Sequence, residues 1–389
     1  MSEVRHDHDR VYEGKPVPGR ARRGRIHPVV VIVVLVVTIC GVFVGVRVFS
    51  GSGEPPVTVV RALLASKREF FEDAEVKRLL LAKGFRVEVT PAGSFDIVRS
   101  EDIDSYHFVF PSGQSAADLI RDRRARRHAV PFRPFFSPIV LGTFREYADA
   151  LVKAGAATKQ NDLYYTLELD KLVDLMDHGK TWSDYQVDNR NRLLAQIPDP
   201  CRTYSGSIYV ALLSFAKHSG KTPVDEAEAL GWASEIKPLF DAEGQHGEDL
   251  SPKYLAPEGR SFAPVVVIYE HQFIAHQVRT HDRTGRPDAE RVLLYPSAQH
   301  ETAPELISFT PEGDQIGRLL MEDPGLRRRA VELGFHVLGV GEDVQSPEFS
   351  SMLTGRGLPV PRNGVGDTET WLPKPALFEK MITAIAGCR

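Results

Sequence analysis

Apolar residues form one unbroken run near the start of the chain and recur in short blocks after it. The run covers residues 28–46 (PVVVIVVLVVTICGVFVGV) and contains no charged side chain. At about 19 residues, it is close to the roughly 20 that a helix needs to cross the hydrocarbon core of a bilayer. The pattern therefore predicts a single transmembrane helix over residues 28–48.

The charges beside this run predict its orientation. Four arginines precede it within residues 20–25, whereas Arg47 and Arg61 are the only basic residues between positions 47 and 66. Because basic residues stay on the cytoplasmic side of a membrane helix, we expect a single-pass protein with a cytoplasmic N-terminus and an extracellular C-terminal part. A cleaved signal peptide is the alternative, but its apolar core is usually about 7–15 residues long.

Short polar segments border the predicted helix. Residues 1–27 are charged and contain few large apolar side chains, which predicts a disordered cytoplasmic tail. Residues 49–56 include the sequence GSGEPP and are predicted to be a linker. The chain that follows is long enough for two domains of ordinary size.

A strand–helix rhythm begins after the linker. Val57–Leu64 reads as a strand, and Ser66 with Glu69 three residues later fits a capping box at the start of a helix. Gly84 is placed to end that helix, and Phe85–Thr90 alternates as the next strand. A strand, a helix and a second strand form a βαβ unit, so the sequence predicts an α/β fold with a parallel sheet.

The same rhythm continues to the end of the chain. Apolar blocks between turn residues predict buried strands, and apolar residues at helical spacing predict helices. One predicted strand contains Pro138 and is expected to be broken there. The predicted strands are 106–110, 135–144, 264–269 and 291–295. The predicted helices are 170–177, 316–320 and 327–333, together with a helix that starts near 112 and a helix that follows a turn at 200–207 and ends at 215.

Net charge argues against a nucleic-acid partner. The chain has 48 Lys and Arg against 52 Asp and Glu, and residues 1–27 hold seven of the basic and four of the acidic ones. The remainder, with 41 basic and 48 acidic residues, has a formal charge of −7 and does not suit an extended phosphate-binding surface. A local basic stretch at 121–127 (RDRRARR) is more typical of a solvated helix face.

Cysteine usage favours one disulfide. Cys40 lies in the predicted membrane helix, and Cys201 and Cys388 lie beyond it. Because the exterior of the cell permits disulfides, the even count favours a Cys201–Cys388 bridge, with two buried free thiols as the alternative. Closing so long a loop stabilises a fold by on the order of 4–5 kcal/mol in the chain-entropy model.

Serine-bearing turns recur where predicted strands pass into helices. A helix start presents unpaired N–H groups and a partial positive charge, so several starts that converge on a cleft bind an anionic or polar ligand. Serine is also a common helix cap, which is sufficient to explain any one of these turns. Their recurrence at strand ends favours the ligand interpretation. The candidate ligand-binding residues of these turns are Ser66, Lys67, Ser112, Gly113, Ser205, Gly206 and Ser207.

Three further candidates stand at the ends of predicted strands. Tyr269 and Glu270 follow the strand at 264–269, and Tyr295 ends the strand at 291–295. A carboxylate such as Glu270 accepts a hydrogen bond from a ligand hydroxyl or amine, or caps the next helix. A tyrosine at such a position flanks a cleft or packs in the core.

Motifs for catalysis and metal binding are missing in any suitable context. His271, His276 and His281 are spaced by five, whereas metal ligands on a helix prefer a spacing of four. The sequence offers no nucleophile elbow, Walker A loop, C-x-x-C or dinucleotide-binding glycine motif between a strand and a helix. We therefore expect neither an enzyme nor a cofactor or metal site.

Four stretches of the chain resemble bacterial extracellular solute-binding proteins of the type II periplasmic-binding fold. The similarity covers most of the chain after the linker, and its motifs are loose, so they identify a fold better than a ligand. The four stretches are 66–80 (SKREFFEDAEVKRLL), 200–213 (PCRTYSGSIYVALL), 265–273 (VVVIYEHQF) with 293–297 (LLYPS), and 317–335 (GRLLMEDPGLRRRAVELGF).

The resemblance implies two α/β lobes that close on a ligand in a central cleft. Ser137 lies at the first expected crossing between the lobes and is included among the ligand-binding residues. A Cys201–Cys388 bridge would then link the two lobes and restrict their closure. The implied crossings lie near 137–141 and 291–296, with 57–137 and 295–389 in lobe 1 and 138–294 in lobe 2.

The function implied by the resemblance is a membrane-anchored extracellular protein that captures a small polar or anionic solute for transport or sensing. A membrane transporter or a cell-envelope protein is the implied partner. The alternative is an extracellular scaffold or protein-interaction module with a degenerate cleft, which a cleft of bulky apolar residues would favour. A hydrolase would need a nucleophile–base pair, and the sequence offers none.

Overall fold

A computed structural model gives the structure of most of the chain after the linker. It describes residues 57–243, 247, 249–298, 301–302, 304–338, 347–361 and 372–388. The predicted tail, membrane helix and linker at 1–56 lie outside these residues. No helix among the residues that the structure describes is long and apolar enough to span a bilayer.

The first of two sheets has five strands in the order β2-β1-β3-β11-β4. β1 pairs in parallel with β2 and β3, which confirms the predicted βαβ unit, whereas β11 is antiparallel to both β3 and β4. We call this sheet with its helices the first half. Its strands are β1 (Thr58–Leu64), β2 (Phe85–Pro91), β3 (Phe108–Phe110), β4 (Val130–Phe132) and β11 (Leu306–Ser308), and its helices are α2 (Arg68–Glu72), α3 (Ala74–Ala82), α4 (Ser94–Arg99), α5 (Gln114–Arg123), α13 (Pro311–Glu322) and α14 (Pro324–Glu332).

The second sheet has seven strands in the order β10-β5-β9-β7-β6, and β8 and β12 also pair with β5. We call this sheet with helices α6 to α12 and α16 the second half. Its strands are β5 (Phe135–Phe144), β6 (Ala157–Lys159), β7 (Tyr164–Leu167), β8 (Val265–Tyr269), β9 (Arg291–Pro296), β10 (Glu301–Thr302) and β12 (His336–Val337). Its helices are α6 (Arg145–Lys153), α7 (Leu169–Asp177), α8 (Tyr204–Lys217), α9 (Glu226–Glu243), α10 (Ser251–Leu255), α11 (Gly259–Phe262), α12 (Glu270–Thr284) and α16 (Pro375–Ala386).

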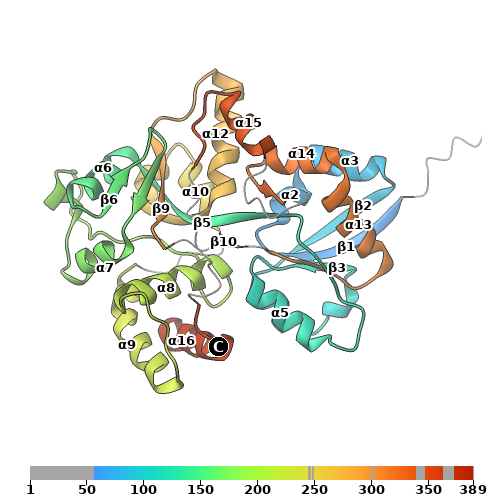
Figure 1. Cartoon of the computed structure of the whole chain (residues 1–389), viewed down its shortest axis with the longest axis horizontal. Coiled ribbons are helices and arrows are strands. Elements are labelled where there is room, and N and C mark those ends of the chain that lie inside the picture. Colours follow the sequence, from blue (N-terminus) through green and yellow to red (C-terminus); the bar gives the residue numbers. More distant parts are fainter. Residues whose placement is uncertain are drawn as a thin grey trace, which may run out of the picture. The chain divides into compact units, whose positions relative to one another are not determined.

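Strand β5 carries the chain from the first half into the second (Figure 1). Its first residues pair with β12 and β10, and its later residues pair with β8 and β9, so one strand joins several distant segments. All of its residues are buried. The expected break at Pro138 does not occur, because Pro138 lies opposite Glu301 at the short strand β10 and the strand continues past it.

The chain returns to the first half later than predicted. β9 stays in the second sheet through Pro296, and the chain next pairs in the first sheet at β11. A further helix, α15 (Pro347–Thr354), packs against α14.

The predicted first lobe wrongly includes the C-terminal helix. α16 packs against α9 and α8 of the second half, as Figure 1 shows. Its apolar side chains Phe378, Met381 and Ile385 are buried there, and Lys237 of α9 donates a hydrogen bond to the carbonyl of Ile385 at 2.9 Å. Burial of this apolar face outweighs continuity of the chain with the first half.

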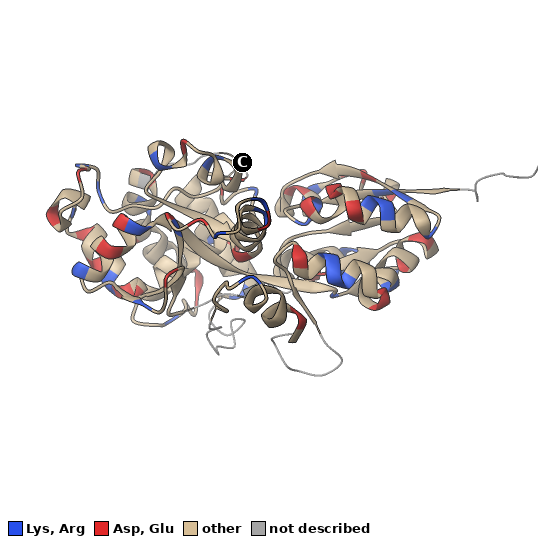
Figure 2. Cartoon of the chain, turned by 90° about the horizontal axis from the view of Figure 1, so that it is seen from above, with Lys and Arg blue, Asp and Glu red and all other residues tan. Residues whose placement is uncertain are grey.

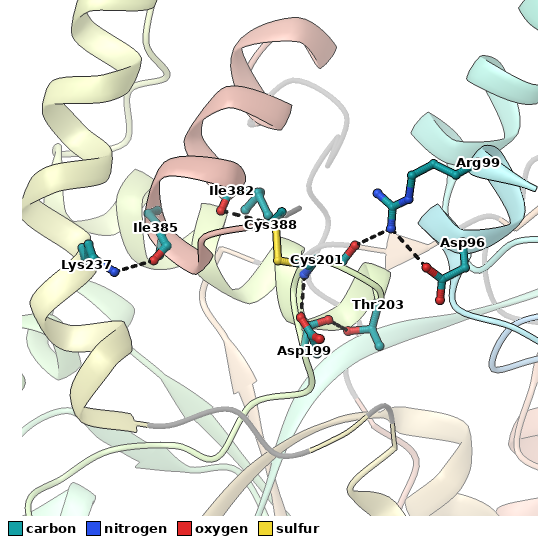
Figure 3. Close-up of a disulfide and its surroundings, with 9 residues drawn as sticks. All are labelled: Asp96, Arg99, Asp199, Cys201, Thr203, Lys237, Ile382, Ile385 and Cys388. Atoms are coloured by element: carbon teal, nitrogen blue, oxygen red, sulfur yellow. Dashed lines mark hydrogen bonds and ion pairs between the residues drawn. A yellow bond between two sulfur atoms is a disulfide. The ribbon is translucent and has the colours of Figure 1, made fainter.

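Cys201 and Cys388 form a disulfide with an S–S distance of 2.12 Å (Figure 3). Cys201 lies in the loop before α8, and Cys388 lies just after α16. Because both segments belong to the second half, the bridge does not tie the halves together, contrary to what the predicted boundary implied.

Charged side chains of both signs are spread over the helices of both halves (Figure 2). The basic stretch at 121–127 follows this rule, since Asp104 pairs with Arg124 and Arg127, and Asp118 pairs with Arg121. The stretch is only in part the solvated helix face that the sequence indicated, because α5 ends at Arg123 and Arg124 is buried.

Candidate functional site

A small cavity lies between the two halves. It is lined from the first half by the ends of β1, β2 and β3, and from the second half by the start of α8, the end of β8 and the segment before α10. Its volume is about 40 Å³, which is room for on the order of three water molecules or one small oxyanion.

Two serines of the first half meet at this cavity. Ser66 follows β1 and Ser112 follows β3, and since these strands are parallel neighbours, their carboxyl ends lie together. The Ser66 and Ser112 Oγ atoms are 2.6 Å apart, and the Ser66 N–H donates to Ser112 Oγ at 3.1 Å. Ser94, at the start of α4, accepts from the Ser112 N–H at 3.0 Å.

The predicted capping box at Ser66 and Glu69 is wrong. The residue at the N-cap of α2 is Lys67, and its side chain makes no capping hydrogen bond. The Ser66 hydroxyl is engaged by Ser112 instead, so a tertiary contact replaces the local one.

The second half contributes the start of α8. Thr203 caps this helix, with its Oγ1 accepting from the Gly206 N–H at 3.3 Å, and Tyr204 and Ser205 then line the cavity. Gly206 packs on backbone, because a Cβ there would lie 2.2 Å from the carbonyl oxygen of Pro198. Ser207 does not line the cavity: its hydroxyl donates to the Tyr204 carbonyl inside the helix at 2.9 Å.

Tyr269 closes the cavity at the end of β8. Its side chain is buried among the cavity lining. Burial raises the pKa of Tyr269 to about 12, although the hydroxyls of Ser112, Ser66 and Ser205 act in the opposite direction. The phenol therefore stays protonated at neutral pH.

Lys67 does not line the cavity but lies directly behind Ser66, which does. It is fully buried, and its Nζ donates to Ser66 Oγ at 3.2 Å and lies 4.1 Å from the centre of the Tyr269 ring. Burial lowers the pKa of Lys67 to about 7, against the opposing charge of Glu69. This buried amine contacts the cavity hydroxyls through Ser66.

Asp249 and Gln272 also line the cavity and were not predicted as ligand-binding residues. Gln272 Nε2 donates to Glu69 Oε1 at 2.8 Å and to Asp249 Oδ1 at 3.3 Å, so it joins the halves behind the cavity. Burial and the charge of Glu69 raise the pKa of Asp249. Asp249 follows no recognisable strand or helix signal, whereas Ser94 sits in a strand-to-helix turn and could have been found by the rule that identified Ser112.

Three further predicted residues do not line the cavity, in addition to Lys67, Gly113, Gly206 and Ser207. Glu270 is fully buried, accepts a hydrogen bond from the Tyr295 hydroxyl and pairs with Nε2 of His336. Ser137 Oγ accepts from the His271 N–H at 3.0 Å. These contacts connect β5, β9, β12 and α12, so Glu270, Tyr295 and Ser137 stabilise the second half around the strand by which the chain enters it.

The three regularly spaced histidines have different partners. His271 Nδ1 lies 3.0 Å from Ser137 Oγ, His276 Nε2 lies 2.9 Å from Asp288, and His281 Nδ1 lies 3.5 Å from Asp282. Among the described residues, no group of three or more His, Cys, Asp or Glu side chains could hold a metal ion.

No protein-family model matches the sequence, and no curated protein matches it. Solved structures do match. Apo ferric ion-binding protein A of Pasteurella haemolytica aligns over 85% of this chain and 97% of its own at 11% identity, with a TM-score of 0.51. The substrate-binding protein of an ABC transporter from Agrobacterium tumefaciens aligns over 86% and 96% at 14% identity, with a TM-score of 0.50. The ferric binding protein of Campylobacter jejuni aligns over 84% and 98% at 8% identity, with a TM-score of 0.50.

The fold is that of the periplasmic-binding-protein-like proteins. This confirms the resemblance at the level of the two-sheet α/β architecture. Identities of 8–14% show the fold alone and carry no ligand across.

Proposed function

We propose that this chain binds a small polar or anionic solute in the cavity between its halves and makes or breaks no bond. The observation that carries the proposal is the convergence of hydroxyls from both halves on one buried space. They come from Ser66, Ser94, Ser112, Ser205 and Tyr269. Such a wall supplies several neutral hydrogen bonds to one polar ligand while excluding water.

Binding would act by drawing the halves together. Contacts between the halves surround the cavity: Arg202 donates to Asp96 at 2.9 Å, and Arg99 donates to the carbonyl of Cys201 at 3.0 Å (Figure 3 shows the latter). A solute that bonds both Ser112 and Ser205 makes its full set of contacts only when the halves are together. It would therefore shift the population toward the closed arrangement.

The ligand class follows from the lining. Two of the similar structures are named as ferric binding proteins. In this cavity Asp249 is the carboxylate of the lining, and Tyr269 remains a neutral phenol. A ferric ion prefers anionic ligands, so this wall fits an acceptor-rich solute better.

We also propose that the binding part is extracellular and anchored by residues 28–48, with a transporter or an envelope protein as partner. The basic residues at 20–25 and the uncharged run after them support the anchor. The similar protein from Agrobacterium tumefaciens is named as part of an ABC transporter, which supports delivery of the solute. A tethered receptor serves sensing equally well.

A scaffold with a degenerate cleft is the second candidate. The observation that favours it is the small volume of about 40 Å³, in a lining that includes the bulky side chains of Tyr204 and Tyr269. A scaffold would be indifferent to solutes and would depend on a protein partner.

A thermal-shift screen of the full-length chain separates the two. The panel contains small oxyanions, polyols, amino acids and cations. A solute at about 100 times its dissociation constant adds roughly 2.7 kcal/mol to the free energy of unfolding and raises the midpoint by several degrees. The paired change Ser66→Ala with Ser205→Ala should abolish the shift. A folded protein that responds to no solute favours the scaffold.

A further inference from the structure

A short chain of hydrogen bonds leads from Lys67 to the cavity. Lys67 Nζ lies 3.2 Å from Ser66 Oγ, and Ser66 Oγ lies 2.6 Å from Ser112 Oγ. Ser112 Oγ also accepts from the Ser66 N–H at 3.1 Å. Both serines line the cavity, whereas Lys67 is sealed behind them.

The charge of Lys67 decides which group is the donor and which is the acceptor in each of these hydrogen bonds. An ammonium has three donors and no acceptor, so a charged Lys67 donates to Ser66 Oγ and cannot accept the Ser66 proton. The two serines hold two O–H protons, and one of them forms the bond between Ser66 and Ser112. The other proton then has no acceptor within the pair and must be donated outward, toward Tyr269 or the cavity.

A neutral Lys67 removes this constraint. Its nitrogen then has a lone pair that accepts the Ser66 O–H, and Ser112 in turn donates to Ser66. No serine proton is left over for the cavity. The lysine therefore sets the number of donors offered at the wall without touching the solute.

Other side chains of the lining carry donors as well. Arg68 lines the cavity together with these serines, and the Tyr269 phenol, which also lines it, is protonated. The Asp249 carboxylate faces the same cavity, but its Oδ1 already accepts from the Ser251 N–H, the Ser251 hydroxyl and Gln272. With Lys67 charged, the hydroxyl cluster is left with a surplus of donors, which a small acceptor-rich group completes.

We propose that the solute is a small oxyanion, such as a carboxylate, phosphate or sulfate, and that Lys67 takes up a proton when the anion binds. This rests on the proposed function and names its ligand class and its pH dependence. Lys67 is a positioning residue, because it acts through Ser66 rather than on the anion itself.

The groups that face Lys67 are compatible with this exchange. Glu69 of α2 favours its charged form, Tyr269 at the end of β8 and Phe335 present ring faces to it, and His271 of α12 lies beyond Glu69. Burial lowers the pKa of His271 to about 4, so this histidine stays neutral near pH 7. With its own pKa lowered to about 7, Lys67 is the group among these that changes charge there.

Titration calorimetry of the full-length chain tests the proposal with acetate and sulfate as probes. Both probes stay fully ionised between about pH 6 and about pH 8, so any pH dependence belongs to the protein. Chloride at matched ionic strength is the reference. We expect affinity to fall by about tenfold per pH unit above pH 7, and proton uptake that two buffers of different ionisation enthalpy reveal. Phosphate, run in parallel, shows which oxyanion the cavity prefers.

Variants of one lysine separate charge from structure. Lys67→Met should bind both probes weakly and with no pH dependence, whereas Lys67→Arg should keep binding and lose the pH dependence. Lys77→Met, at an exposed position of α3, is the matched control and should behave as the unchanged protein. If Lys67→Met does not fold, the ¹³C signal of the Lys67 ε-carbon in the unchanged protein gives the same answer, because acetate should raise its titration midpoint.

The outcomes distinguish this inference from the proposed function. Suppose that a neutral polyol binds, that Ser66→Ala weakens this binding, and that acetate, sulfate and phosphate do not bind. This result overturns the oxyanion as the ligand class and leaves the solute-binding function standing. Anion binding that is independent of pH, with an unmoved Lys67 midpoint, overturns the role of the lysine. A chain that binds no solute of any class overturns the proposed function, and the inference with it.

Discussion

The ring of Tyr204 lies directly against the backbone of Gly113. A Cβ at Gly113 would lie 2.2–2.3 Å from three atoms of that ring, far closer than real Cβ atoms approach other atoms. Tyr204 starts α8 in the second half, and Gly113 is the N-cap of α5 in the first half. The absence of a side chain at Gly113 thus lets the two walls of the cavity meet.

Gly113→Ala should hold the halves apart. The backbone at Gly113 is extended, at φ −142° and ψ 156°, so alanine adds a clash with Tyr204 without backbone strain. We expect the affinity for sulfate to fall by about tenfold or more, because the closed population decreases. Small-angle scattering in saturating sulfate should show a larger radius of gyration than for the unchanged protein. Gly231→Ala, where a Cβ meets nothing within 4 Å, is the control. Equal compaction in both variants would show that the contact does not limit closure.

Ser205 and Ser207 were both predicted to bind the ligand from the same helix start, but only Ser205 lines the cavity. Ser205 lines the cavity, and Ser207 bonds the carbonyl of Tyr204 within its own helix. Ser205→Ala should weaken binding of a charged probe such as sulfate by about 1.5–3 kcal/mol, the usual worth of a hydrogen bond to a charged group. Ser207→Ala should leave affinity unchanged, as measured by calorimetry. If Ser207→Ala weakens binding and Ser205→Ala does not, the solute binds at another part of α8.

The disulfide should contribute strongly to stability. Cys201 and Cys388 are separated by 187 positions, and in the chain-entropy model closing such a loop contributes about 5 kcal/mol. The paired change Cys201→Ser with Cys388→Ser should therefore lower the thermal midpoint by several degrees, and α16 should be the first segment to lose protection from hydrogen exchange. Thiol labelling of the unfolded, non-reduced chain should find Cys40 alone. Labelling of Cys201 or Cys388 would show that they are unpaired.

His271 should make the protein sensitive to acid. Burial lowers its pKa from 6.5 to about 4, so the unfolded chain binds a proton between these values and the folded protein does not. The stability associated with neutral His271 is complete above pH 6.5 and is lost as the pH falls to about 4, by on the order of 3 kcal/mol. Urea unfolding at pH 7 and near pH 4.5 measures this loss.

A variant pair isolates the histidine from the carboxylates that also titrate in acid. His271→Gln should lose less stability on acidification than the unchanged protein, whereas His178→Gln should lose the same amount, since the His178 side chain is 66% exposed. If His271→Gln retains the full acid dependence, another group is responsible.

Local patterns predicted the elements well. The apolar stretch at 57–64 predicted β1, alternation predicted β2, and the apolar block at 135–144 became β5 with the expected bounds. Gly84 ends a helix at φ +83°, a conformation that glycine adopts without strain. These features depend on neighbours in sequence, which is why the sequence alone could predict them.

Features that depend on distant contacts could not be predicted. β11 joins β3 across nearly 200 positions, and α16 turns back to α9 because its apolar face finds burial there. The site also combines features that depend on local sequence with features that depend on distant contacts. The position of Ser66 and Ser112 at strand ends could be predicted. The capping box was wrong because Ser66 bonds Ser112, which follows the neighbouring strand β3. Asp249 reaches the cavity from a segment whose own residues carry no signal.

Calorimetric titration of the full-length chain with sulfate near pH 6 tests the central claim most directly. We predict saturable binding at one site, lost in the variant that carries both Ser66→Ala and Ser205→Ala and retained in Ser207→Ala. Unchanged binding in the double variant, or no binding of sulfate, acetate or phosphate by a folded chain, would contradict the account of an oxyanion held between these two serines.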